Sequence, residues 1–110
     1  MKISIIVLAA TAFMYSLSCA AMTEAEGRCV SGALKSKVEK NVNSAIGSCR
    51  GVTDGEGICI EGALLSGAEK FVMGAKSTCT EATVGQALCA TAAISAGVEI
   101  TLFSALNSCR

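Results

Sequence analysis

The stretch "CVSGALKSKVEKNVNSAIGSC", from Cys29 to Cys49, decides the fold because its cysteine interval is repeated twice along the chain. The same interval returns in "CIEGALLSGAEKFVMGAKSTC" (59–79) and in "CATAAISAGVEITLFSALNSC" (89–109). A fixed period of this length is typical of a chain assembled from repeated supersecondary units. The sequence therefore predicts a single domain over residues 21–110 that consists of three repeats, at 23–52, 53–82 and 83–110.

A helix-capping pattern recurs in phase with the cysteines. In the capping box Thr-x-x-Glu/Gln, the hydroxyl accepts a hydrogen bond from the third helical N–H, and the Glu or Gln side chain accepts one from the N–H of the Thr. The pattern occurs at Thr23/Glu26, Thr53/Glu56 and Thr83/Gln86. It predicts that helices begin near residues 24, 54 and 84.

Apolar side chains recur at helical spacing through each repeat. In the first repeat they are Val30, Leu34, Val38, Val42 and Ile46. The chain contains no proline. Because only short linkers near 50–53 and 80–83 separate the repeats, this pattern predicts an all-α, disulfide-stabilised, up-down-up bundle of three long helices.

That bundle predicts a disulfide at each linker. Cys49 and Cys59 flank Thr53 symmetrically, and Cys79 and Cys89 flank Thr83 in the same way. Antiparallel helices would bring each pair to the same height, so we expect the disulfides Cys49–Cys59 and Cys79–Cys89. Cys29 and Cys109 would then be free thiols or would bridge to a second chain.

Three small helical hairpins, each closed by its own disulfide such as Cys29–Cys49, are the alternative. Ser36-x-x-Glu39 and Ser66-x-x-Glu69 resemble second capping boxes and favour this arrangement. The segments "VEK", "AEK" and "VEI" at the three midpoints are not turn formers and count against it.

The N-terminal residues have the layout of a secretory signal peptide. Lys2 precedes an apolar stretch over residues 3–17 that is followed by small residues, which predicts a signal peptide over 1–20 with cleavage after residue 18, 20 or 21. Export to an oxidising compartment explains seven cysteines in so short a chain. We therefore expect a secreted, extracellular, cysteine-rich protein with disulfide bonds.

The composition excludes several function classes. The chain has no His, so the usual general base near neutral pH is missing, and its cysteine spacing does not suit a zinc site. Glu39, Glu69 and Glu99 recur once per repeat and are interpreted as solvent-facing helix residues rather than catalytic carboxylates. A formal net charge of +0 gives no footprint for nucleic acid. We predict no enzymatic activity, no metal and no cofactor.

The third repeat is unusually apolar. From Val84 to Cys109 its only charged residue is Glu99, so two neighbouring helices cannot cover all of its apolar surface. The side chains predicted to stay uncovered form an apolar stripe of Ala92, Ala96, Ile100 and Phe103.

This stripe suggests how the protein functions. We expect a non-enzymatic helical scaffold that binds a partner protein or an apolar small molecule and self-associates as a homo-oligomer, with two third helices joined along their stripes. The alternative is a membrane-active secreted effector, such as a toxin or host-defence protein, that uses the third helix at a membrane surface. Weak net charge counts against the alternative.

Overall fold

The computed structural model of the protein describes residues 22–110. The predicted signal peptide and Cys19 lie outside these residues. The described chain forms six α-helices and no strand. In chain order they are α3 (Glu24–Lys35), α4 (Val42–Cys49), α5 (Asp54–Ser66), α6 (Val72–Cys79), α7 (Val84–Ser95) and α8 (Leu102–Ser108).

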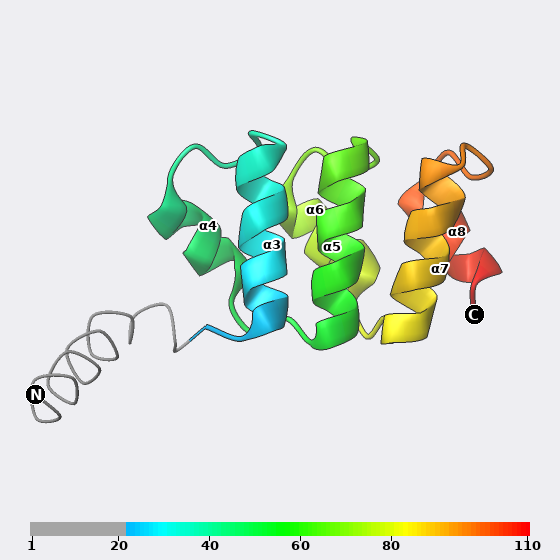
Figure 1. The fold of residues 1–110 in the computed structure, drawn as a ribbon, viewed down its shortest axis with the longest axis horizontal. Coiled ribbons are helices and arrows are strands. Elements are labelled where there is room, and N and C mark those ends of the chain that lie inside the picture. Colours follow the sequence, from blue (N-terminus) through cyan, green and yellow to red (C-terminus); the bar gives the residue numbers. More distant parts are fainter. Residues whose placement is uncertain (1–21) are drawn as a thin grey trace, which may run out of the picture.

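The helices pair into three consecutive hairpins, one for each repeat (Figure 1). The longer helices α3, α5 and α7 stand side by side and form one layer, with α3 against α5 and α5 against α7. The shorter helices α4, α6 and α8 form the second layer, and each packs on the longer helix of its own repeat. The result is a short solenoid, in which each repeat contacts only its neighbours.

The all-α class is confirmed, but the prediction of three long helices is wrong. Each repeat breaks at its midpoint, where one residue after the longer helix adopts positive φ: Lys37 at 65°, Gly67 at 79° and Gly97 at 74°. This left-handed conformation ends a helix. The midpoint Glu then closes the turn, as where the Glu39 N–H donates to the Ala33 carbonyl at 3.2 Å.

The disulfides follow the hairpins and not the linkers. Sulfur bridges join Cys29 to Cys49, Cys59 to Cys79 and Cys89 to Cys109, with Cα separations of 5.7, 5.8 and 5.9 Å. The predicted Cys49–Cys59 and Cys79–Cys89 pairs are therefore wrong, and Cys29 and Cys109 are not free thiols. The hairpin alternative is the arrangement found, because a chain that turns at its midpoint brings the two ends of each repeat together.

The three capping boxes at Thr23, Thr53 and Thr83 are present at the starts of α3, α5 and α7. Two of them also hold the following linker. The second carboxylate oxygen of Glu26 accepts from the N–H of Gly51 at 2.7 Å, and that of Glu56 accepts from the N–H of Glu81 at 2.7 Å. One carboxylate therefore fixes both the start of a longer helix and the chain that leaves the same hairpin.

The midpoint glutamates are structural. Glu39 accepts from the hydroxyls of Ser44 at 2.7 Å and Ser48 at 3.3 Å, and Glu99 accepts from Ser104 at 2.6 Å and Ser108 at 3.1 Å. The interpretation of these carboxylates as solvent-facing helix residues is therefore wrong. They lie in the turns and tie each turn to its shorter helix.

Small side chains and disulfides form most of the core. The fully buried positions of the two layers are largely alanines and half-cystines, and Ile60 and Leu64 are the two largest fully buried side chains. Small residues let the paired helices approach closely. They also leave modest apolar burial per repeat, so the covalent links matter for stability.

Candidate interaction face

The site is built from the contact between successive repeats. Where α3 meets α5, Gly32 lies so close to Glu61 that a Cβ on this glycine would stand 2.9 Å from the Glu61 Cα. Arg28, one turn earlier on α3, pairs with the Glu61 carboxylate at 3.5 Å. The side of each repeat that meets the next one is called its forward face.

The second junction repeats this geometry one period later. A Cβ on Gly62 would stand 2.5 Å from the Thr91 hydroxyl of α7. A Cβ on Gly55 would stand 1.9 Å from the carbonyl oxygen of Ala82 in the linker. The forward faces of the first two repeats therefore depend on positions where no side chain fits.

The third repeat has the same forward face, but no other part of residues 22–110 covers it. Its forward face consists of Gly85, Leu88, Cys89 and Ala92, one period after the positions that line the second junction. All four residues are exposed. Leu88 is 57% exposed, although it is a large apolar residue.

The disulfides report the same difference. Cys29 and Cys59 are 0% and 1% exposed, whereas the equivalent Cys89 is exposed. Since the three hairpins share one internal structure, the covering of the first two disulfides comes from the repeat that follows. Within the described chain, the forward face of the third repeat therefore lacks the cover that the first two repeats have.

The structure exposes every residue of the predicted apolar stripe but divides the stripe among different elements. Ala92 lies on α7, Ala96 at its C-cap, Ile100 in the turn and Phe103 on α8. Ile100 is 89% exposed and Phe103 is 69% exposed. Only Ala92 belongs to the forward face. The position of Phe103 is also exposed in the first two repeats, at Asn43 and Met73, so this exposure is common to all three described repeats.

A second group of apolar residues lies in the turns, along the edge where all three hairpins reverse (Figure 1). Phe71, Val98 and Ile100 are 74%, 75% and 89% exposed. Phe71 occupies the N-cap of α6 without a side-chain cap, whereas Asn41 and Thr101 cap the equivalent helices. The second repeat thus has an exposed aromatic side chain where its neighbours have a hydrogen bond.

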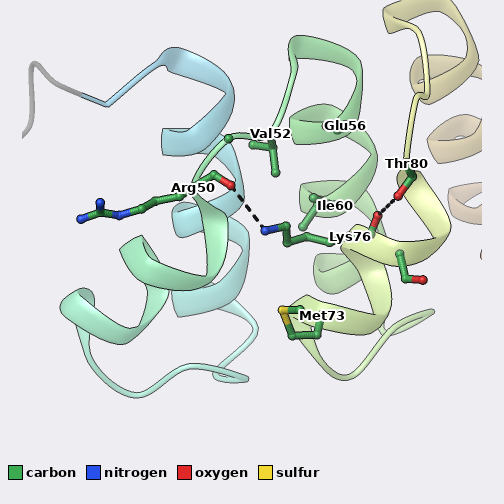
Figure 2. Close-up of a pocket in the computed structure, with 9 residues that line it drawn as sticks. Arg50, Val52, Glu56, Ile60, Met73, Lys76 and Thr80 are labelled. Atoms are coloured by element: carbon green, nitrogen blue, oxygen red, sulfur yellow. Dashed lines mark hydrogen bonds between the residues drawn. The ribbon is translucent and has the colours of Figure 1, made fainter.

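Open grooves run along the junctions between repeats. Figure 2 shows the one beside α6, with a volume of about 360 Å³, which the Lys76 side chain crosses to donate to the Arg50 carbonyl at 3.4 Å. Its lining residues include Arg50, Val52, Glu56, Ile60, Met73, Lys76 and Thr80. A groove of about 370 Å³ beside α7 includes Leu88. Both have charged rims and are open to solvent, so neither encloses an apolar molecule in the way that small-ligand sites do.

Two carboxylates of the capping boxes, those of Glu26 and Glu56, have lowered pKa values for structural reasons. The N–H of Thr23 and then that of Gly51 lower the pKa of Glu26 by hydrogen bonding to its carboxylate. The N–H of Thr53 lowers the pKa of Glu56, with a further lowering from the N–H of Glu81 that partial desolvation opposes. Among residues 22–110, no group of His, Cys, Asp or Glu side chains is placed to hold a metal ion.

Two further findings concern membranes and relatives. Within the described chain, no helix combines the length and the apolarity needed to cross a bilayer. No family model matches the sequence, and the comparisons with curated proteins and with solved structures found no match.

The forward face could not be found from hydrophobicity alone. The sequence indicates that the third repeat is too apolar to be covered, and the structure identifies Leu88 and Cys89 as the uncovered residues that matter at the junction. Their signal is positional. Cys89 stands one period after a half-cystine that is buried, and Leu88 stands one period after the half-buried Ile58. This relation becomes visible only when the three repeats are aligned and their contacts are known.

Proposed function

We propose that this protein is a secreted, non-enzymatic helical scaffold that binds a protein partner through the forward face of its third repeat and thereby self-associates. One observation carries the proposal: Cys29, Cys59, Ala25 and Gly55 are buried in the first two repeats, whereas their equivalents Cys89 and Gly85 in the third repeat are exposed. Within residues 22–110, the third repeat leaves Leu88 and the half-cystine Cys89 exposed on this face. Repeats of a solenoid bury such faces against a neighbouring repeat.

Two further observations support parts of the proposal. Three disulfides in residues 22–110 fit an oxidising compartment, as expected after export. The grooves at the repeat junctions are open and have charged rims, so a flat protein surface fits this molecule better than an apolar small molecule does.

The fluorescent probe 1-anilinonaphthalene-8-sulfonate gains fluorescence when it binds exposed apolar surface. It tests whether the forward face of the third repeat is such a surface. We expect the secreted protein, at concentrations low enough to keep copies apart, to enhance the fluorescence and Leu88→Gln to remove most of the gain. Met73→Gln is the matched control, because Met73 is 66% exposed and lies on the second repeat. Equal fluorescence from the two variants would contradict the proposed binding face.

The second candidate is the membrane-active effector, and the exposed Phe71, Val98 and Ile100 along the turn edge favour it. Vesicles of phosphatidylcholine and phosphatidylserine loaded with carboxyfluorescein provide the test. Leakage caused by the wild-type protein and lost in Ile100→Ser, with Leu88→Gln still active, would favour this candidate. Intact vesicles at micromolar protein would remove it.

A further inference from the structure

We propose that the forward face of the third repeat binds the first repeat of a second copy of this chain, so that the repeat continues head-to-tail from one molecule into the next. The inference rests on the proposed function, because it takes the forward face as a binding surface. It adds the identity of the partner, the region of the partner that is bound and the direction of the assembly.

The first repeat has an uncovered rear face, which is the surface that a forward face would bind. The rear face of a repeat is the side that meets the preceding repeat, and in the first repeat it includes Gly27, Ser31 and Val42. Val42 is 54% exposed, whereas its equivalents Val72 and Leu102 are each 3% exposed. The shared hairpin structure cannot account for this difference, so the preceding repeat covers this position in the second and third repeats.

The space around equivalent glycines also indicates that the rear face of the first repeat is uncovered. A Cβ on Gly57 would stand 2.6 Å from the Ala25 carbonyl oxygen of the preceding repeat, whereas a Cβ on Gly27 would meet nothing within 4 Å. A Cβ on Gly85, at the other end, would also meet nothing within 4 Å. The described chain therefore has one unfilled forward face and one unfilled rear face, at opposite ends of the row of repeats (Figure 1).

The side chains of these two faces are compatible. The first junction pairs Arg28 with Glu61 at 3.5 Å. In the second junction Ile58 and Thr91 occupy the same two positions, and between copies they would be Leu88 and Ser31. The junction between copies would thus resemble the second one, an aliphatic side chain beside a hydroxyl, without an unpaired charge.

The side chains of the two faces are also small enough for the helices of two copies to approach closely. Gly32 and Gly62 lie at close approaches in the first two junctions, and Ala92 takes this position in the third repeat. The residue that faces it in the partner would be Ser31, which is smaller than the Glu61 and Thr91 of the internal junctions. The extra methyl group of Ala92 is therefore matched by a smaller residue on the opposite surface.

The geometry favours head-to-tail contact over a two-fold dimer. Forward and rear faces are different surfaces, and a two-fold contact between forward faces would leave Val42 of both copies uncovered. A heterologous contact between different faces builds rings if its rotation closes and open chains if it does not. The internal junctions step in one direction along the row, so we expect an open series of species that grows with concentration.

Sedimentation velocity of the full chain, expressed with its N-terminal segment in a secreting host, tests the proposal. Leu88→Glu blocks the forward face and Ser31→Glu blocks the rear face. We expect each variant to raise the concentration for half-association about tenfold or more, because a charge would be buried without a partner. A mixture of the two variants should form pairs and nothing larger, since only one unblocked junction remains between them.

Three further variants make the result specific. Leu88→Arg combined with Ser31→Glu should restore association in a salt-sensitive form, because it transfers the Arg28–Glu61 pair to the junction between copies. Phe103→Glu is the matched control outside the forward face and should associate like the wild type. Gly85→Ala should raise the melting temperature of the single chain and leave association unchanged, because Ala25 occupies the equivalent position in the first junction.

Each contrary result has one meaning. Association that is lost in Leu88→Glu or Phe103→Glu but unchanged in Ser31→Glu would show a two-fold contact and overturn the head-to-tail proposal. A wild-type protein that stays monomeric at about 100 µM, where contacts with a Kd of about 0.1 mM or tighter are populated, would overturn it as well. If that monomer still lost its probe fluorescence in Leu88→Gln, the forward face would stand as an apolar binding surface, whereas self-association and the second copy as partner would both fail.

Discussion

The first two repeats and the third have the same helices, the same disulfide and the same capping box, yet they differ in what covers them. Cys29 and Cys59 are buried, and Cys89 is not. The difference teaches that a 30-residue hairpin of this kind is only part of a folding unit. Its core is completed by its neighbour, so the stability of a repeat depends on the junction after it as much as on its own contacts.

Removal of a disulfide should have the largest effect on stability, and the effect should differ between the second and the third repeat. We expect Cys59→Ala with Cys79→Ala to lower the free energy of unfolding by about 3–5 kcal/mol, because a cross-link and buried packing are both lost. The same change at Cys89 and Cys109 should cost about 2–3 kcal/mol, since mainly the cross-link is lost there. Urea denaturation of the two double variants measures both values.

Mild reduction gives an independent control on the same pairs. Alkylation followed by mass spectrometry should label Cys89 and Cys109 before the other four half-cystines, because a reductant reaches exposed sulfur first. Equal unfolding free energies for the two double variants, together with simultaneous labelling, would show that the following repeat does not protect the disulfide beneath it.

Two glycines at the same position of successive repeats offer a finer comparison. Gly55→Ala should destabilise the protein by about 1–3 kcal/mol, because the added Cβ would collide with the backbone of the next linker. Gly85→Ala should stabilise the single chain by about 0.5–1 kcal/mol, since alanine favours a helix and meets nothing there. Thermal melts at low protein concentration measure both changes in stability. If both variants were stabilised or both destabilised, the structure of the second junction would be contradicted.

The N-caps of the shorter helices distinguish the second repeat from its neighbours. Phe71→Asn should stabilise the protein by about 0.5–1 kcal/mol, because Asn supplies the capping bond that Asn41 makes to the Ser44 N–H at 2.7 Å. Asn41→Ala is the matched control: it removes the capping bond from the first repeat and should lower the free energy of unfolding by a similar amount. If Phe71→Asn stabilises the fold but reduces vesicle or probe binding, the aromatic residue is retained for an interaction.

The smallest expected effect concerns pH. Because the pKa of Glu56 is lowered in the folded protein, its carboxylate stabilises the fold above the unfolded-state pKa, and this contribution is lost as pH falls through the folded-state value. Gln86, at the same position of the third repeat, does not titrate. Glu56→Gln should therefore weaken the loss of stability on acidification below about pH 4.5. Urea midpoints at several pH values measure the slope, and an unchanged slope would exclude this carboxylate as its source.

The parts of the fold that were predictable are those fixed by local chemistry. Each capping box lies within four residues, so Thr23, Thr53 and Thr83 indicate helix starts whatever the rest of the chain does. The midpoint turns were missed because apolar spacing continued across them through Val38 and Val42. In-phase Gly67 and Gly97 were the available signal, but Lys37 adopts the same left-handed conformation without glycine and concealed it.

The candidate site was predictable only in part, for a different physical reason. The excess of apolar residues in the third repeat can be counted in the sequence, and the exposure of Ile100 and Phe103 follows from it. The role of Leu88 depends on what the equivalent Arg28 and Ile58 contact in the next repeat. Such a relation between repeats is three-dimensional, and no local pattern records it.

The closure of each disulfide inside its own hairpin has a consequence for biogenesis. Six cysteines can pair in 15 ways, and a chain that waited for its last residue would have to search among them. With both partners only 20 residues apart, each pair can meet while later repeats are still being synthesised. On the export route proposed above, the chain would enter the oxidising compartment N-terminus first, so Cys29 and Cys49 could be oxidised before Cys59 arrives. The order of appearance would then favour the native pairing.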